Sequence, residues 1–198
     1  MVDLKDFAEI PVAVLADSQT LGGVMDSGIR PVAPGMTLLG RALTCRCMPG
    51  DNLTLHKALT VAGPGDVPVV SGSGMDCSVL GEMMAVYCQT KSVAGVVIDG
   101  CVRDSAALAE MAFPVFARGM HPKGPSRSAM GAIGEAVECG GVAVETGDII
   151  AADADGVVVI KSQEAEAVLT KAKDKLSKEA EWMKLLKAGH STWELLNL

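Results

Sequence analysis

The sequence predicts a single α/β domain, and three observations support this fold class. Apolar residues make up 49% of the 198 residues but aromatic residues only 3%, so the core must be built mainly from aliphatic side chains. The runs GVVID at 95–99 and GVVVI at 156–160 have the continuous Val and Ile content of strands buried on both faces. Strand-like segments alternate with short helical segments, as in α/β proteins. A chain of 198 residues can bury the core of one domain, so residues 1–198 are assigned to one domain.

Hydrophobic periodicity and turn residues predict the elements of the first half of the chain. In order, they are a helix at 9–22, a strand at 36–47, a helix at 54–62, a short strand at 67–71 and a helix at 78–92. The turn PGDN at 49–52 precedes the second helix, which Asn52 or Thr54 is expected to cap. Gly72-Ser73-Gly74 is expected to form a loop.

The second half repeats the alternation and then ends in helix. Its predicted elements are a strand at 95–99, a helix at 105–112, a strand at 114–119, strands at 135–145, 149–151 and 156–160, and a helix at 163–187. Residues 120–134 are rich in Gly, Pro and Ser and are expected to form a loop. The DADG segment at 153–156 is typical of a turn. The many charges of the last helix indicate a solvated face, with subunit contact as the alternative.

Composition excludes several classes of function. The net charge is −7 and no basic run is present, so nucleic acid is not an expected partner. No apolar stretch reaches the roughly 18 residues of a membrane span, and the first ten residues lack signal-peptide character, so no membrane association is expected. Six scattered cysteines indicate buried, reduced thiols and a cytoplasmic location. Cys45 and Cys47 are too close in sequence, and too isolated, for a structural zinc site.

The first candidate site follows the strand at 95–99. Asp99, Gly100, Arg103 and Asp104 come at its carboxyl end, where open α/β sheets bind ligands. The guanidinium of Arg103 can hold a carboxylate, and Asp104 is a hard oxygen ligand suited to Mg²⁺ or Mn²⁺. Together they would hold a 2-oxo acid. The alternative is a structural Arg-Asp pair that caps the next helix, with Asp104 or Ser105 as the cap.

The second candidate site is GEMM at 81–84, at a predicted helix start. Free backbone N–H groups at a helix N-terminus bind carboxylates, and Glu82 could orient a water bound to a metal ion. The alternative is an acidic residue that merely complements the helix dipole.

The remaining polar residues carry weaker signals. His56 and His121 lack a metal-binding spacing and are interpreted as structural or loop residues. Lys123 and Arg127 either close over an anionic substrate or are simply solvated. Gly72-x-Gly74 lacks the third glycine of a dinucleotide-binding loop, so neither a nicotinamide cofactor nor S-adenosylmethionine is expected.

Six segments together closely resemble the RraA-like family over about residues 10–162. They are VMDSGIRP (24–31), PGDN (49–52), GPGDV (63–67), GVVIDGCVRD (95–104), FPVFARG (113–119) and GDIIAADADGVVVI (147–160). That family includes the regulator of ribonuclease E activity and the class II 4-hydroxy-4-methyl-2-oxoglutarate / 4-carboxy-4-hydroxy-2-oxoadipate aldolases. The resemblance implies a three-layer β/β/α swivelling-type domain. It also implies a homotrimer, in some members a hexamer, with sites between subunits.

The resemblance also implies roles for individual residues. The aldolases have an acidic residue, twenty intervening residues and then Arg-Asp, which here corresponds to Glu82 followed by Arg103 and Asp104. Characterised aldolases commonly have Asp where this chain has Glu82. By resemblance, Arg103 binds the substrate oxygens, Asp104 holds Mg²⁺ or Mn²⁺, and Glu82 orients a proton-carrying water. The backbone amides of Gly81, Glu82, Met83 and Met84 would line the substrate carboxylate.

The implied activity is a metal-dependent lyase that cleaves 4-hydroxy-2-oxo acids to pyruvate and also decarboxylates oxaloacetate. Both reactions pass through the same enolate, which a divalent cation stabilises. A carboxylate from a neighbouring subunit's C-terminal region completes the aldolase site, and Glu179 and Glu181 are the candidates here. The alternative function is that of a non-catalytic regulator that binds ribonuclease E or another protein.

Overall fold

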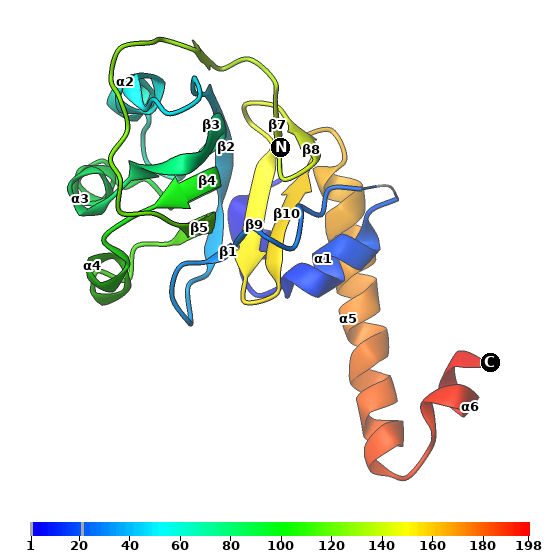
Figure 1. Ribbon diagram of the computed structural model, residues 1–198. Coiled ribbons are helices and arrows are strands. Elements are labelled where there is room, and N and C mark those ends of the chain that lie inside the picture. Colours follow the sequence, from blue (N-terminus) through cyan, green and yellow to red (C-terminus); the bar gives the residue numbers. More distant parts are fainter. Residues whose placement is uncertain (1, 21) are drawn as a thin grey trace.

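The computed structural model describes residues 2–20 and 22–198 and confirms the α/β class (Figure 1). Met1 and Leu21, which fall in the predicted domain and in the predicted first helix, lie outside the described residues. The helices are η1 (Leu4–Phe7, a 3-10 helix), α1 (Val12–Ser18), α2 (Leu53–Val61), α3 (Glu82–Thr90), α4 (Ser105–Glu110), α5 (Ala165–Lys187) and α6 (Thr192–Leu196). The strands are β1 (Arg30–Pro31), β2 (Leu38–Arg46), β3 (Asp66–Leu80), β4 (Val96–Val102), β5 (Val115–Met120), β6 (Ala132–Ile133), β7 (Val137–Cys139), β8 (Val142–Val144), β9 (Ile149–Asp153) and β10 (Gly156–Ile160).

The main sheet has a parallel half and an antiparallel half. Its strand order is β1-β5-β4-β3-β2-β9-β10, and β6 pairs with β2 outside this path. Strands β2, β3, β4 and β5 are parallel neighbours, whereas β9 and β10 continue the sheet antiparallel to β2. The hairpin β7-β8 forms a separate two-stranded sheet. Helices α2, α3 and α4 form the crossover connections between successive parallel strands. Parallel neighbours need such connections, because the chain must return to the same end of the sheet before each new strand.

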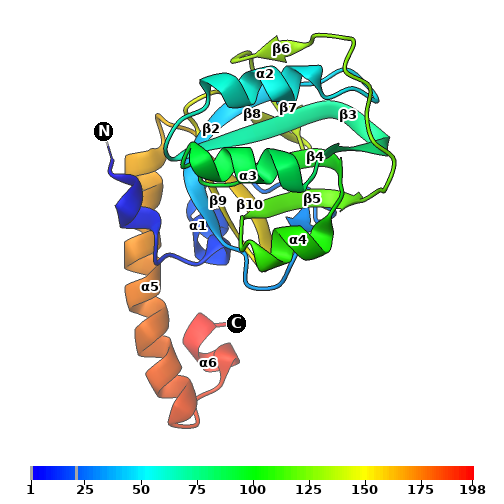
Figure 2. The same ribbon diagram turned by 90° about the vertical axis from the view of Figure 1, so that its left-hand side faces the viewer.

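Three packed clusters define the layers. One lies between helices α2–α4 and the parallel strands, with Leu55, Leu108 and Ile98 fully buried. A second lies between the parallel strands and the β7–β10 region, around Phe116 and Ile150. These clusters produce the predicted β/β/α layers, with the three helices on one side in both views (Figures 1 and 2). A third cluster packs η1, α1 and the start of α5 onto the outer face of β9 and β10, so helices also cover the second β layer.

The long helix predicted at 163–187 is confirmed as α5. Its first turns are buried through Ala165, Val168, Leu169 and Ala172, which pack on the second β layer. Its second half projects away from the body in both views (Figures 1 and 2). The tail then forms α6, which was not predicted and which begins with a capping box between Ser191 and Glu194.

The prediction for residues 67–80 was wrong in part. The expected loop at 72–74 lies inside β3, which continues to Leu80 and displaces the start of the next helix from 78 to 82. The pairing of β3 with β4 shifts register between Val70 and Leu80. Gly72 and Gly74 have positive φ angles of 78° and 74° there. The glycines therefore mark irregularities within a strand, where they permit a bulge, and not its end.

The cysteines are buried, as the sequence predicts. All six cysteines are buried and none forms a disulfide. Within residues 2–20 and 22–198, no helix has both the length and the apolar character needed to cross a bilayer.

Candidate functional site

The two predicted site segments meet because β3 and β4 are adjacent parallel strands. Leu80 is paired with Val102 at their carboxyl ends, and the Arg103 N–H donates to the Leu80 carbonyl at 3.0 Å. Gly81 and Arg103 therefore leave the same edge of the sheet side by side. This edge is where parallel sheets present their ligand sites.

Gly81, Glu82, Arg103 and Asp104 form one contact cluster. The Glu82 backbone N–H donates to Asp104 Oδ2 at 3.0 Å, and Arg103 Nε lies 3.6 Å from the same oxygen. A Cβ on Gly81 would overlap the Asp104 carboxylate and lie 3.0 Å from Arg103 Cγ. Glycine at 81 is therefore what allows the Arg-Asp segment to approach the N-terminus of α3.

The conformation of Asp104 tests whether its side chain caps the next helix, α4. Asp104 is the N-cap residue of α4, but its side chain makes no capping hydrogen bond to that helix. Its backbone is left-handed, with φ 59° and ψ 38°, a conformation that few non-glycine residues adopt. The carboxylate is directed instead to the amide of Glu82 on α3. This arrangement disfavours the capping of α4, because the carboxylate instead satisfies the first amide of α3. A role of Asp104 in ligand binding stays a prediction.

The cluster lines a pocket of about 310 Å³. Its walls come from α2, the end of β3, the start of α3, the segment after β4 and the loop after β5; they are Asn52, His56, Ser78, Val79, Leu80, Gly81, Glu82, Met83, Met84, Arg103, Asp104, Pro125 and Arg127. The six residues to which the family resemblance assigns roles are all among them, whereas Asp99 and Gly100 are not. A second depression of about 350 Å³, bounded by Met120, His121 and Pro122, shares Arg103 and Asp104, so the pair is reached from two sides.

The donor set of this pocket suits a hard cation that keeps water or substrate as ligands. Among the described residues, no group of three or more His, Cys, Asp and Glu side chains could hold a metal. Glu82 and Asp104 supply two carboxylates at one mouth of the pocket, and about 41% of the Asp104 side chain is exposed. Mg²⁺ is commonly held by one or two carboxylates together with waters and substrate oxygens. The residues present therefore fit a Mg²⁺-type ion and not a four-ligand zinc site.

The backbone amides at the start of α3 are partly engaged. The Glu82 amide donates to Asp104, and the Met84 amide donates to the Gly81 carbonyl at 3.1 Å. The side chain of Met83 is 86% exposed and projects at the pocket mouth. Binding of a carboxylate by the amides of 81–84 stays a prediction.

A buried aspartate fixes the loop that bears Arg127. Asp51 Oδ2 accepts hydrogen bonds from the amides of Ser128, at 2.7 Å, and Ala129, at 3.1 Å, and from the Ser126 hydroxyl. These bonds hold the pKa of Asp51 well below its usual range, and the bond from the Ser126 hydroxyl has the largest effect. The loop places Arg127 at the pocket wall.

Lys123 has a different place from Arg127. Its carbonyl accepts from both the amide and the hydroxyl of Ser78, at 2.9 and 3.0 Å, so the backbone of this loop is tied to β3. Lys123 is not among the residues that line the pocket. For Lys123 and Arg127 the sequence left open whether they close over an anionic substrate or are simply solvated, and the structure brings Arg127 to the pocket wall.

Sequence reasoning missed two side chains of the pocket. His56 was interpreted as structural and Asn52 only as a helix cap, but both line the pocket from the first turn of α2. Asn52 makes no capping bond and donates instead to the Val79 carbonyl at 2.8 Å. Burial, followed by the nearby charge of Arg127, lowers the pKa of His56. The PGDN-x₃-H spacing was the available signal, because N-cap and N4 side chains share one face of a helix.

The prediction that Asp99 belongs to this site was wrong. Asp99 lies within β4, whose residues alternate between the two faces of the sheet. Its carboxylate pairs with Arg118 of β5 and accepts from the Gly140 amide at 2.8 Å. The strand continues to Val102, three residues beyond its predicted end, so Asp99 is a structural residue.

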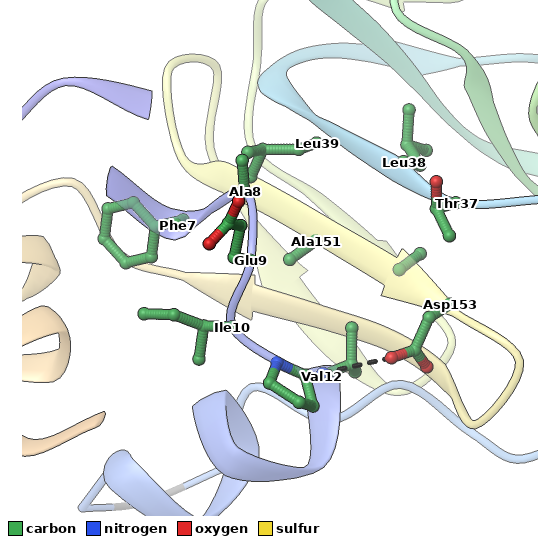
Figure 3. A pocket seen from close by; sticks show the side chains of 12 residues that line it. Phe7, Ala8, Glu9, Ile10, Val12, Thr37, Leu38, Leu39, Ala151 and Asp153 are labelled. Carbon is green, nitrogen blue, oxygen red and sulfur yellow. Dashed lines mark hydrogen bonds between the residues drawn. The ribbon is translucent and has the colours of Figure 1, made fainter. Parts of the chain in front are cut away.

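A further pocket of about 420 Å³ lies between the N-terminal segment and the β2–β9 region. Figure 3 shows its largely apolar wall, which includes Phe7, Ile10 and Leu39. The carboxylate of Asp153 accepts from the Val12 amide at 3.1 Å and so fixes the start of α1. The Asp155 N–H donates to the other carboxylate oxygen of Asp153, Oδ1, and closes the turn that was predicted for the DADG segment.

Fold and pocket together define an α/β protein with an Arg-Asp site at the end of its parallel strands. The sequence model of the RraA-like family, described as Aldolase/RraA, matches residues 12–159. The chain belongs to the RraA-like family.

Named relatives agree with this membership. A protein of Halalkalibacterium halodurans named "Putative 4-hydroxy-4-methyl-2-oxoglutarate aldolase" is 37% identical over 176 residues, which cover 87% of this chain and 82% of that protein. The structure of RraAS2 from Streptomyces coelicolor, described as an unusual member of the RNase ES inhibitor RraA protein family, has a TM-score of 0.79 at 29% identity. That match covers 93% of this chain and 94% of RraAS2. An uncharacterised protein from Pseudomonas syringae pv. tomato has a TM-score of 0.87 at 25% identity, over 97% and 95% of the two chains.

Proposed function

We propose that this protein is a divalent-metal-dependent lyase that cleaves 4-hydroxy-2-oxo acids to pyruvate and decarboxylates oxaloacetate as a side reaction. The observation that carries the proposal is the cluster of Gly81, Glu82, Arg103 and Asp104 on one pocket. The aldolase name of the Halalkalibacterium relative supports the same reaction class. The substrates are 4-hydroxy-4-methyl-2-oxoglutarate and 4-carboxy-4-hydroxy-2-oxoadipate or close analogues.

Asp104 is the residue that would hold the cation, Mg²⁺ or Mn²⁺, because its carboxylate lies between the Glu82 amide and Arg103. Glu82, the first residue of α3, would orient a water bound to that ion. When bound, such an ion supplies the Lewis acid that stabilises a pyruvate enolate.

Arg103 binds and orients the 2-oxo acid. Its guanidinium contacts Asp104 through Nε and also lies near Gly124. Glycine at 124 leaves room for the guanidinium, because a Cβ at that position would lie 3.2 Å from Arg103 Nη1. The other nitrogens can donate to substrate oxygens, and the positive charge favours the negative charge that develops as the C–C bond breaks. Arg127 adds a second cation for a substrate with two carboxylates.

Glu82 is proposed to hold and move the proton. Glu82 is exposed and lines the pocket, and its own backbone amide is the one that donates to Asp104. As the C3–C4 bond breaks, a carboxylate in this place can take up, through a water in the pocket, the proton that leaves the 4-hydroxyl group, and can then return it to the enolate carbon.

The assembly is proposed to be a homotrimer, or a hexamer of two trimers, with its sites between subunits. In one chain, neither Glu179 nor Glu181 lines the pocket, and both lie on the part of α5 that projects from the body (Figure 2). A projecting helix can reach a neighbouring copy. Glu181 is the better candidate to complete the neighbour's site, because Glu179 is paired with Lys175 at 3.4 Å.

A second candidate function is regulation of ribonuclease E or another protein. The similarity to RraAS2 favours it, as do the exposed apolar side chains of Met83, Val86 and Tyr87 on α3. Retention of ribonuclease E from solution by the immobilised protein, unaffected by Asp104→Ala, is the result that this alternative predicts.

Pyruvate release tests the proposal. Purified protein is incubated with Mg²⁺ and either 4-hydroxy-4-methyl-2-oxoglutarate or oxaloacetate, with a chelator in parallel. Turnover of both substrates that the chelator abolishes is expected. Turnover of neither would overturn the lyase assignment and leave the regulator. Turnover of oxaloacetate alone would establish the site but reject these hydroxy acids as substrates.

A further inference from the structure

Two unpaired polar atoms lie in the wall of the proposed catalytic pocket. Among residues 2–20 and 22–198, three buried side-chain polar atoms lack a hydrogen-bond partner: Gln19 Nε2, Asn52 Oδ1 and His56 Nε2. The second and third belong to residues that line the pocket. Since buried polar groups are nearly always hydrogen-bonded, two orphans in one pocket indicate a ligand group that pairs with them.

The same turn of α2 presents both side chains. Asn52 precedes the helix, and the His56 backbone N–H donates to the Asn52 carbonyl at 3.0 Å, so the two side chains lie one above the other. Asn52 is 3% exposed, and its amide is oriented by the bond from Nδ2 to the Val79 carbonyl at 2.8 Å. That bond leaves Oδ1 as the free atom, and an amide oxygen can only accept a hydrogen bond.

His56 supplies the complementary donor. Charged and titratable groups in the same pocket are Arg103, Arg127, Glu82 and Asp104. Burial and then the charge of Arg127 lower the imidazole pKa, so the ring is neutral near pH 7. In the tautomer with a proton on Nε2, the ring donates one hydrogen bond into the site where Asn52 Oδ1 accepts one.

One acceptor and one donor side by side fit a hydroxyl group. A hydroxyl donates its single proton to an acceptor and accepts from a donor through its lone pairs, so one such group satisfies both orphans. Both atoms have almost no surface accessible to solvent, so a substrate hydroxyl reaches them only when a neighbouring side chain moves aside. The side chain beside Asn52 is Met84, with Sδ at 3.6 Å from Nδ2, and an unbranched Met can change rotamer to admit a small polar group.

We propose that Asn52 and His56 form a hydroxyl-binding subsite that recognises the 4-hydroxyl group of the substrate. The inference rests on the proposed function, because that function places a 4-hydroxy-2-oxo acid in this pocket. Substrate specificity would then come from the start of α2. Asn52 and His56 would distinguish substrates that carry a 4-hydroxyl group from oxaloacetate, which has none. A site with buried polar groups rejects a ligand that leaves them unpaired.

Substrate-dependent kinetics test the subsite. His56→Phe removes the donor at similar ring size, and Asn52→Leu removes the acceptor at similar shape. For each variant, kcat/KM is measured with 4-hydroxy-4-methyl-2-oxoglutarate and with oxaloacetate. We expect a loss of about 10- to 100-fold for the hydroxylated substrate and less than about 3-fold for oxaloacetate. His190→Phe, in the exposed tail, is the matched control and should change neither.

Equal losses with both substrates, or no loss with either, would overturn the proposal, because a merely structural role has no reason to discriminate. His56→Phe remains informative if Asn52→Leu fails to fold, since it leaves the bond from Asn52 to Val79 in place.

Histidine NMR supplies a readout that does not need turnover. The chain has three histidines, so ¹⁵N-histidine spectra are assigned with the single variants. With chelator present, 4-hydroxy-4-methyl-2-oxoglutarate should shift the His56 Nε2 signal, whereas 2-oxoglutarate should not. Equal shifts with both ligands, or none, would contradict the subsite. If wild-type protein releases no pyruvate, the proposed function fails, but this spectrum still decides whether the pair binds a hydroxyl.

Discussion

Two Arg-Asp pairs lie on or beside β4, and they differ in exposure and in their other partners. The Arg103–Asp104 pair follows the strand, with 42% and 41% of the two side chains exposed and 3.6 Å between Nε and Oδ2. The Arg118–Asp99 pair is closer, with exposed fractions of 27% and 23%. It is extended by the Gly140 amide on Asp99 and by Asp26 on Arg118 at 3.1 Å. The second pair uses its hydrogen-bonding capacity within the protein, whereas the first retains much of its capacity for a ligand.

The difference shows how identical residue types acquire different roles. Asp99 points from the middle of a strand toward Arg118 and the β7–β8 turn, so its partners come from the fold itself. Asp104 sits at a left-handed position just past the strand end, where the chain turns and the carboxylate is left at a pocket. The expectation is that changes at the first site affect stability and changes at the second affect activity.

The largest effect is expected for Asp104→Ala. It removes the proposed cation ligand, so pyruvate release should fall about 1,000-fold in kcat/KM. The free energy of unfolding should drop by only about 1–3 kcal/mol, because the change removes an exposed ion pair and the bond to the Glu82 amide and places Ala at a left-handed position. Steady-state kinetics and urea unfolding of the same preparation check both parts. A variant that unfolds but retains its specific activity would reverse the assignment of the two pairs.

A smaller loss of activity is expected for Glu82→Gln. It keeps the size of the side chain but removes the proton acceptor, so the rate should fall roughly 100-fold. Glu110→Gln, at the end of α4, is the matched control and should keep full activity. A Glu82→Gln enzyme with the wild-type rate would remove Glu82 from the proton transfer.

Asp99→Asn tests the structural pair. The change leaves Arg118 partly buried with a weakened partner, so the free energy of unfolding should drop by about 1–3 kcal/mol. Urea denaturation measures the drop, and kcat per folded molecule should stay within about 3-fold of wild type. If activity fell with no change in stability, Asp99 would have to act on the site after all.

An effect on stability that depends on pH is expected for Asp51→Asn. The pKa of Asp51 is lowered in the folded protein, so its carboxylate contributes stability above the ordinary Asp value of about 3.9. This contribution is lost as the pH falls below that value toward the lowered pKa. The difference in urea midpoint between wild type and Asp51→Asn should therefore be full at pH 7 and shrink below about pH 4. A difference that stays constant down to pH 3 would contradict the role of the charge.

The alternation of elements and the long helix at 163–187 could be predicted from local pattern. The pairing of 81–84 with 103–104 was predicted only through the family resemblance, which also supplied the roles. The path of β3 through Gly72–Gly74 could not be predicted, because glycine marks a loop and a bulge equally well. The face taken by Asp99 and the place of His56 depend on register and on the packing of α2, which are long-range properties.

Metal binding tests the distinction between the two pairs most directly. Binding of Mn²⁺ is followed by electron paramagnetic resonance in wild-type protein, Asp104→Asn and Asp99→Asn, with folding verified by circular dichroism. The account predicts one site in the wild type that Asp99→Asn preserves and Asp104→Asn weakens by about 10-fold or more. Equal affinity in wild type and Asp104→Asn would show that Asp104 holds no cation, and the proposed lyase site would have to be abandoned.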